Sequence, residues 1–220
     1  WLVAAMSFFM AVGVIWALLF LPPDYQQSFT TRILVIHVAV AGTSLAFFPL
    51  MAVAGTITLV WKMKLADMVA KHAAPLGAWF SFITLATGSL WGSVMWGTWW
   101  EWDPKLTSFL ILFLFYLGYI ILWAAVEDPD TAADLTSVLC IVGSVFAVLS
   151  RYATIFWNQG LHQDASLSID KEEHVADVFY YPLIVVMAGF VLLFVALVLL
   201  NTRSEIMKRR AGAIMARSRI

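Results

Sequence analysis

The sequence predicts an all-α integral membrane protein: a bundle of six transmembrane helices with a tryptophan-rich loop on the non-cytoplasmic side. Of its 220 residues, 62% are hydrophobic and only 12% are charged, which is far more apolar than a soluble domain. The apolar runs are each close to the roughly 20 residues that a helix needs to cross a hydrocarbon layer. Helices satisfy their own backbone hydrogen bonds in lipid, so these runs are expected to be helical.

Charged and turn-forming residues divide the chain into six apolar spans. The first span is expected to end at the Pro22-Pro23 pair, and Pro49 predicts a kink inside the long second span. Arg151 interrupts the fifth span near its end. The expected spans are residues 1–21, 33–61, 75–91, 106–126, 135–157 and 182–200.

Lysine and arginine fall mainly on one side of these spans, and cytoplasmic segments carry such an excess. The basic side holds Lys62, Lys64, Lys71, Arg203, Lys208, Arg209, Arg210, Arg217 and Arg219. The other side holds Arg32, Lys105, Arg151 and Lys171. With an even number of spans, both termini are expected in the cytoplasm, and the loops 22–31, 92–105 and 158–181 face outward together.

We expect one membrane domain over residues 1–220, with three notable segments. These are the tryptophan-rich segment 91–108 between the third and fourth spans, the outer loop 158–181, and a basic cytoplasmic tail at 201–220. Because the first residue is Trp1 and not Met, we expect further residues to precede it. The lone cysteine, Cys140, excludes a disulfide framework and is expected to be a packing residue.

The segment WGSVMWGTWWEWDPKLTS, residues 91–108, holds five of the eleven tryptophans. An interfacial belt needs about one or two tryptophans per helix end, so a belt alone does not explain this density. Gly92 and Gly97 permit tight turns, which favours a folded platform over a regular helix. Indole faces suit contact with a porphyrin. The platform residues are Trp91, Trp96, Trp99, Trp100 and Trp102, while Asp103 before Pro104 predicts a helix N-cap first and a ligand contact second.

Two histidines are candidate ligands for a haem iron. His37, in RILVIHVAVAG, lies inside the second span near its outer end, where an imidazole is either functional or satisfied by a neighbouring helix. His162, in FWNQGLHQDAS, lies in an outer loop on the same side, where an ordinary exposed histidine is the alternative. Two neutral imidazoles can supply both axial positions of haem. His72 and His174 are assigned to the surface.

Cations at the outer boundary can pair with the haem propionates. Arg32 and Lys105 are the candidates, although interfacial snorkelling explains each of them equally well. Arg151 carries the same ambiguity. The acidic residues Glu127, Asp128, Asp130 and Asp134 form a cytoplasmic loop without evident chemistry.

The tryptophan-rich segment resembles the "WWD" signature of the haem-handling proteins of cytochrome c biogenesis, and most closely the CcmC family of cytochrome c maturation system I. The DYQQ loop with Arg32 and RILVIHV is similar to that family's first histidine region, and residues 157–163 are similar to its second. The likeness covers nearly the whole chain. Two stretches depart from the family pattern. Trp102-Asp103-Pro104-Lys105 stands where the family often reads W-D-A-R, and FWNQGLHQD is one residue longer than the expected W-W-N-T-L-H-Q-G, with Phe156 in place of one Trp.

The resemblance implies a haem-delivery protein of the bacterial inner membrane and not an enzyme. Haem b would sit on the periplasmic face with His37 and His162 as axial ligands, against Trp91, Gly92, Trp96, Gly97, Trp99, Trp100, Trp102 and Asp103. It would be passed to the periplasmic haem chaperone CcmE, within an assembly with the ABC-type subunits CcmA and CcmB and the small membrane protein CcmD. Two alternatives remain open at this point: a haem export channel working with an ABC ATPase, and a redox protein of the cytochrome b kind.

Overall fold

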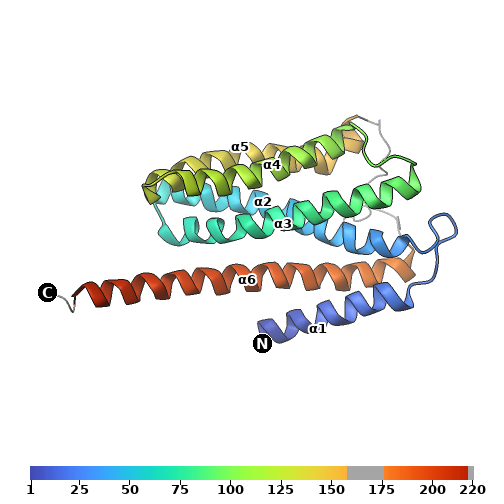
Figure 1. Ribbon diagram of the computed structural model, residues 1–220, viewed down its shortest axis with the longest axis horizontal. Helices are drawn as coiled ribbons and strands as arrows, with labels where there is room; N and C mark the ends of the chain where they lie inside the picture. Colours follow the sequence, from blue (N-terminus) through green and yellow to red (C-terminus); the bar gives the residue numbers. More distant parts are fainter. Residues whose placement is uncertain (158–175, 218–220) are drawn as a thin grey trace.

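Six long helices run back and forth along one axis (Figure 1). The computed structural model describes residues 1–157 and 176–217. Within these residues, six helices are long and apolar enough to cross a membrane, so the predicted fold class is confirmed. The helices are α1 (Leu2–Ile15), extended by the π-helix η1 (Trp16–Phe20), α2 (Thr31–Trp61), α3 (Lys64–Met95), α4 (Pro104–Ala125), α5 (Pro129–Phe156) and α6 (Asp177–Arg217).

Capping residues start two of these helices at the positions that local chemistry favours. The Asp103 carboxylate accepts a hydrogen bond from the Leu106 amide at 2.6 Å, with Pro104 as the first helical residue of α4. Asp128 accepts from the Thr131 amide at 2.8 Å before Pro129 opens α5. An N-cap acceptor satisfies an orphan backbone amide, and proline at the first position loses no hydrogen bond. The predicted cap at Asp103 is confirmed.

Several helices extend beyond the predicted apolar spans. The third helix starts at Lys64, so Pro75 lies inside it. The fifth helix starts at Pro129 and not at residue 135. The last helix covers Asp177–Arg217, which includes the end of the expected outer loop and most of the expected tail. Hydropathy locates the lipid-embedded part of a helix, whereas alanine, lysine, glutamate and arginine continue the helix into water.

The helices form two layers. The helices α2, α3, α4 and α5 pack together, and α1 and α6 lie side by side along one flank of that group (Figure 1). Glycines bring α1 and α6 close: a Cβ at Gly13 would lie 2.9 Å from the Val186 amide nitrogen, and one at Gly189 would lie 3.0 Å from that of Met10. Small residues at a membrane helix crossing allow this backbone approach.

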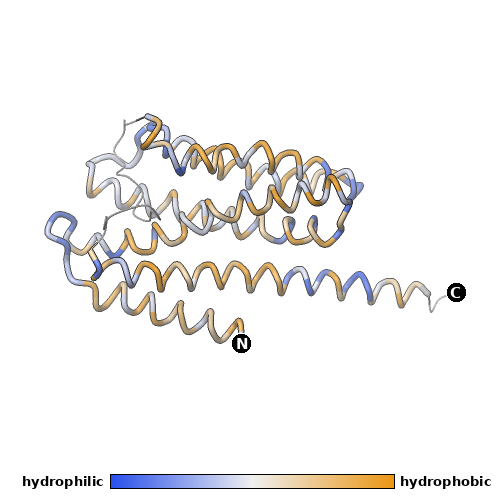
Figure 2. Tube along the Cα trace, turned by 180° about the vertical axis from the view of Figure 1, so that it is seen from behind, coloured by the Kyte–Doolittle hydropathy of each residue, from blue (hydrophilic) through white to orange (hydrophobic). Residues whose placement is uncertain are grey.

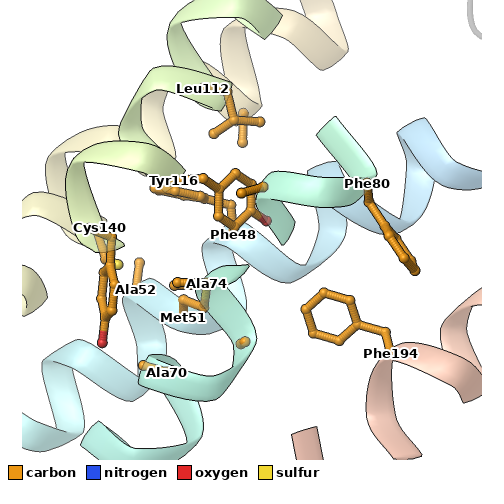
Figure 3. Close-up of a cluster of buried hydrophobic side chains, with 14 of the residues drawn as sticks. Phe48, Met51, Ala52, Ala70, Ala74, Phe80, Leu112, Tyr116, Cys140 and Phe194 are labelled. Atoms are coloured by element: carbon orange, nitrogen blue, oxygen red, sulfur yellow. The ribbon is translucent and has the colours of Figure 1, made fainter. Parts of the chain in front are cut away.

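Aromatic side chains fill the middle of the bundle (Figure 3). Phe48, Leu112, Tyr116 and Cys140 are fully buried, which agrees with the expected packing role of Cys140. The Tyr116 hydroxyl donates to the Ser44 carbonyl oxygen at 2.8 Å. A dense, hydrogen-bonded centre therefore holds α2, α3, α4 and α5 together.

Polar residues gather at the two ends of the bundle and along the last part of α6 (Figure 2). At the end that carries the turn between α2 and α3, Lys62 Nζ lies 2.8 Å from Asp134 Oδ2. Lys64 pairs with Asp130 at the same end. These two carboxylates, to which the sequence assigned no chemistry, therefore tie the start of α5 to the turn between α2 and α3.

Candidate functional site

The candidate site lies at the end of the bundle opposite to the Lys62–Asp134 pair. It is formed by the first turns of α2, the last turns of α3, residues 96–103 and the start of α4. The Thr30 hydroxyl lies 3.9 Å from the Met95 sulfur, so the loop before α2 contacts the end of α3. The structure thus brings His37 and the tryptophan-rich segment to the same end of the molecule.

His37 is half-buried at the contact between α2 and α3. Its Nδ1 atom lies 3.1 Å from the Thr87 hydroxyl oxygen of α3. A Cβ at Gly88 would lie 2.8 Å from His37 Cε1, so the ring rests against the α3 backbone. The imidazole is therefore bonded by a neighbouring helix, which fixes its position without deciding between a structural and a ligand-binding role.

The tryptophan-rich segment changes conformation part of the way along. Trp91 and Gly92 belong to the last turns of α3, which ends at Met95, so the expectation of a non-helical platform is wrong for these residues. Residues 96–103 are not helical, and Gly97 adopts a φ of 72°, a left-handed conformation that favours glycine. The Thr98 hydroxyl donates to the Trp100 carbonyl oxygen at 2.8 Å and stabilises the turn.

Four of the described indole rings of this segment lie in edge-to-face pairs. The ring centroids of Trp91 and Trp96 are 5.1 Å apart with an interplanar angle of 70°. Those of Trp100 and Trp102 are 5.5 Å apart at 77°. Trp99 and Trp102 are 65% and 73% exposed, so this part of the segment offers broad apolar faces to its surroundings.

Two indole nitrogens in this segment are buried and have no hydrogen-bond partner in the part of the chain that the structure describes. They are the Nε1 atoms of Trp91 and Trp100. Buried donors are normally satisfied, so each of these calls for a physical explanation. A bound molecule with acceptor atoms, such as carboxylates, is one partner that would satisfy them.

The three cationic side chains that are candidate partners of the haem propionates lie in different surroundings. Arg32 Nη2 donates to the Leu21 carbonyl oxygen at 3.1 Å, and its guanidinium lies 4.7 Å from the Phe29 ring centroid. Its Nε is buried with no partner among the described residues. Lys105 is half-buried, and its backbone carbonyl accepts from Ser150 Oγ of α5 at 3.4 Å. The Arg151 guanidinium lies 5.3 Å from the Tyr152 ring centroid. Arg32 thus supports the loop before α2 and still holds an unused donor.

Of the three other histidines, the structure describes only one. His162 and His174 lie outside the described residues, so the second expected ligand stays a prediction. His72, which is expected at the surface, is half-buried: its side chain is 21% exposed, and its Nε2 lies 2.8 Å from Glu205 Oε2. The sequence offered no sign of this contact, since Glu205 lies far along the chain on α6.

Thr87 and Gly88 are site residues that sequence reasoning missed. A threonine and a glycine in an apolar helix are ordinary helix-packing residues, and nothing in the local pattern points to His37. The register between α2 and α3 is what places them against the imidazole. No cluster of three metal-ligating side chains occurs in residues 1–157 and 176–217.

The arrangement suits a large planar ligand with an apolar body and acidic substituents. Exposed indole faces supply apolar area, two buried indole nitrogens and the Arg32 Nε have no hydrogen-bond partner among residues 1–157 and 176–217, and His37 supplies an imidazole at the same end of the bundle. These are the groups that a porphyrin with a central metal and propionates would use. The residues present therefore fit haem.

Comparison with known proteins gives a full-length match. A family model described as "Heme exporter protein C" matches residues 1–217. The heme exporter protein C of Rhodobacter capsulatus is 54% identical over 220 residues, which is 100% of this chain and 91% of that protein. That of Paracoccus denitrificans is 55% identical over 217 residues, covering 99% and 90%. That of Escherichia coli K12 is 41% identical over 213 residues, covering 96% and 85%.

Proposed function

Because the chain belongs to the heme exporter protein C (CcmC) family, we propose that it presents haem at the periplasmic face of the inner membrane and passes it to the haem chaperone CcmE. It is a multi-pass membrane protein of cytochrome c maturation that handles haem as cargo. The observation that carries the proposal is the position of His37, which is held by α3 at the same end of the bundle as the tryptophan-rich segment.

Two imidazoles hold the iron in this proposal. His37 supplies one axial ligand from α2, and His162, which follows α5 in the sequence, supplies the other. The contact with Thr87 supports the first assignment, because ligating histidines generally bond a second group through their other ring nitrogen. Bis-histidine ligation gives a low-spin haem whose potential depends on these ligands and their surroundings.

The tryptophan-rich segment covers one side of the porphyrin. Trp91, Trp96, Trp99, Trp100 and Trp102 supply the apolar contact. Gly97 lets the backbone turn beside it, and Gly92, in the last turns of α3, leaves room for the Trp96 ring. The unpartnered indole donors of this segment and Arg32 supply hydrogen bonds to the propionates, with Lys105 as a second cation. Asp103 caps the first turn of α4, directly after Trp102.

An open site suits a protein that must release its cargo. Trp99 and Trp102 are mostly exposed, so a haem lying on them keeps one edge accessible. Affinity comes from surface contact and from the axial bonds and not from enclosure in a deep cavity. A chaperone can therefore reach the ring edge without the bundle opening.

The packing of the bundle argues against a haem channel through this chain. Phe48, Leu112 and Tyr116 fill its centre with no exposed surface, and the Tyr116 hydroxyl is bonded to α2 (Figure 3). A porphyrin would have to displace all of these side chains to pass between the helices. Presentation at one end requires no such movement, which favours the first function over the export channel.

The distribution of charge supports an orientation with both termini in the cytoplasm. The turn between α2 and α3 and the last part of α6 carry most of the basic residues, which is the cytoplasmic pattern. The tryptophan-rich segment is then periplasmic. The ABC-type subunits CcmA and CcmB and the small protein CcmD are the proposed assembly partners, and haem b is the proposed cargo.

The test is the absorption spectrum of the protein purified in detergent from cells that make haem. We expect a low-spin haem spectrum for the wild type and loss of the bound haem in His37→Ala and His162→Ala. His72→Ala is the matched control, because His72 lies at the opposite end of the bundle on α3. Full haem retention in both His37→Ala and His162→Ala would exclude the ligand assignment.

A further inference from the structure

We propose that Thr87 is a positioning residue for His37: it holds the imidazole as the tautomer protonated at Nδ1 and leaves Nε2 to bind iron. Gly88 supplies the backbone surface against which the ring lies. The consequence for haem rests on the proposed function. The tautomer itself is a property of the haem-free protein. It rests on the hydrogen bond between His37 of α2 and Thr87 of α3 and on the hydrogen bond of Thr87 within α3.

The Thr87 hydroxyl has already used its only hydrogen. Its Oγ1 lies 2.7 Å from the Ile83 carbonyl oxygen and 3.3 Å from that of Thr84. A carbonyl oxygen only accepts, and a hydroxyl carries one hydrogen and two lone pairs. Thr87 therefore donates to its own helix, as threonines in membrane helices commonly do, and faces His37 with a lone pair.

The imidazole must then be the donor. His37 Nδ1 lies 3.1 Å from the same oxygen, so Nδ1 carries the hydrogen in this contact. The reverse assignment would leave Thr87 Oγ1 and the Ile83 carbonyl oxygen 2.7 Å apart with no hydrogen between them. A neutral imidazole has a single N–H, so the Nε2 atom of His37 carries the lone pair that a metal requires.

Gly88 limits the orientation of the ring. A Cβ at this position would lie 2.8 Å from His37 Cε1 and 3.4 Å from Nδ1. Real Cβ atoms do not approach other atoms so closely, and the obstacle is a rigid ring and not a flexible chain end. Any other residue at position 88 would therefore force the imidazole or the α3 backbone to shift, which alters the contact between His37 and Thr87.

The hydrogen bond also changes the chemistry of the ligand. An acceptor at Nδ1–H orients a ligating imidazole and raises its basicity, and loss of such a partner typically lowers metal affinity about 10- to 100-fold. A more basic ligand stabilises ferric iron over ferrous iron, so removal of the acceptor raises the midpoint potential of the haem. Thr87 acts through His37 and does not contact the iron.

The first experiment uses the full chain without haem, labelled with ¹⁵N-histidine in lipid nanodiscs. We expect the His37 signals, identified by their loss in His37→Gln, to show a protonated Nδ1 and an unprotonated Nε2. Thr87→Ser keeps this pattern, whereas Thr87→Val, which has nearly the same shape without the hydroxyl, loses it. A wild-type spectrum with the proton on Nε2 would overturn the proposal, whether or not the valine variant folds.

The second experiment measures haem affinity and midpoint potential in the same variants. We expect Thr87→Val to bind haem about 10- to 100-fold more weakly and at a higher potential, and Thr87→Ser to match the wild type. Gly88→Ala should weaken binding, and Gly42→Ala is its control, because a Cβ there meets only the flexible end of Met187 at 3.4 Å. Unchanged affinity and potential in haem-loaded Thr87→Val would overturn the positioning role.

The two experiments separate this inference from the proposed function. Suppose that neither the wild type nor any variant binds haem, but that His37 shows a protonated Nδ1 and an unprotonated Nε2. The proposed function is then wrong, and the tautomer assignment holds. If haem binds and requires His37 but the proton lies on Nε2, the proposed function holds and the role of Thr87 is wrong.

Discussion

The ring of Tyr116 on α4 occupies the space that a side chain at Gly77 on α3 would need, because a Cβ at Gly77 would overlap Cε1 and Cζ of the ring. The Tyr116 hydroxyl reaches past this point and donates to the Ser44 carbonyl oxygen of α2 at 2.8 Å. A single side chain thus joins three helices at the centre of the bundle, between the candidate haem site and the opposite end. The close approach is possible only because residue 77 has no side chain.

Gly77→Ala should therefore destabilise the bundle. Alanine is a better helix former than glycine by about 1 kcal/mol, but the overlap with a buried ring costs more, and overpacked cores typically lose about 1–3 kcal/mol. The measurement is thermal unfolding in detergent. Gly118→Ala is the control, because a Cβ there meets only Leu139 Cδ2 at 3.8 Å, so it should match or exceed the wild type. Equal unfolding temperatures for Gly77→Ala and the wild type would show that Tyr116 moves aside freely.

Glu205→Gln should loosen the attachment of α6 to α3. The Glu205 carboxylate lies 2.8 Å from His72 Nε2 and 3.3 Å from Lys71 Nζ, and it also pairs with Arg209. Without its charge, Lys71 and Arg209 repel each other beside a half-buried amide. We expect a loss of about 1–2 kcal/mol, which is less than for a fully buried ion pair because water screens this one.

Arg209→Gln provides the comparison for Glu205→Gln. The Arg209 side chain is 49% exposed and pairs within one helix, so its loss should cost under about 0.5 kcal/mol. Both variants are compared by thermal unfolding in the same detergent. A larger effect at Arg209 than at Glu205 would mean that the contact between α3 and α6 contributes little to stability.

The membrane-spanning parts of the fold followed from the sequence because lipid imposes a length and a polarity on each helix. The ends of the helices did not follow from it. Helix α3 begins at Lys64, before its apolar part. The Lys64 side chain pairs with Asp130 of α5, a partner that the local sequence does not reveal. Hydropathy therefore located the six long apolar helices and did not reveal the polar turns that extend them.

The candidate site was predictable where a residue is unusual in itself. A histidine inside an apolar span and a run of tryptophans are both rare, and both were identified from the sequence. Thr87 and Gly88 are common in membrane helices, and their contact with His37 depends on the register of two packed helices. The placement of His162 lies outside the described residues and stays a prediction.

Asp128 should titrate below the usual range of an aspartate. Hydrogen bonds from the Thr131 hydroxyl and the Thr131 amide favour the ionised form and lower its pKa from the ordinary value of 3.8. Because the folded pKa is the lower one, the cap is fully formed above pH 3.8 and is lost as the pH falls through the folded value. The measurement is a ¹³C titration of the Asp128 carboxyl together with amide exchange at Thr131.

The control for this titration is Asp128→Asn, which keeps an acceptor for the Thr131 amide and has no carboxyl to titrate. Its exchange rate at Thr131, corrected for the intrinsic dependence on pH, should stay constant over the acidic range in which the wild type changes. A carboxyl titration at or above 3.8 in the wild type would contradict the assigned role of the Thr131 hydrogen bonds.

Asp103 allows its structural role and a haem-binding role to be separated by two substitutions. The carboxylate is buried and caps α4 through the Leu106 amide at 2.6 Å. Asp103→Ala removes the acceptor and should cost about 1 kcal/mol in thermal unfolding, as for other N-caps. Asp103→Asn keeps an oxygen acceptor, so we expect near wild-type stability and near wild-type haem content. If Asp103→Asn unfolds like the wild type but loses its haem, the negative charge itself serves the haem site, and Asp103 is more than the cap that starts α4.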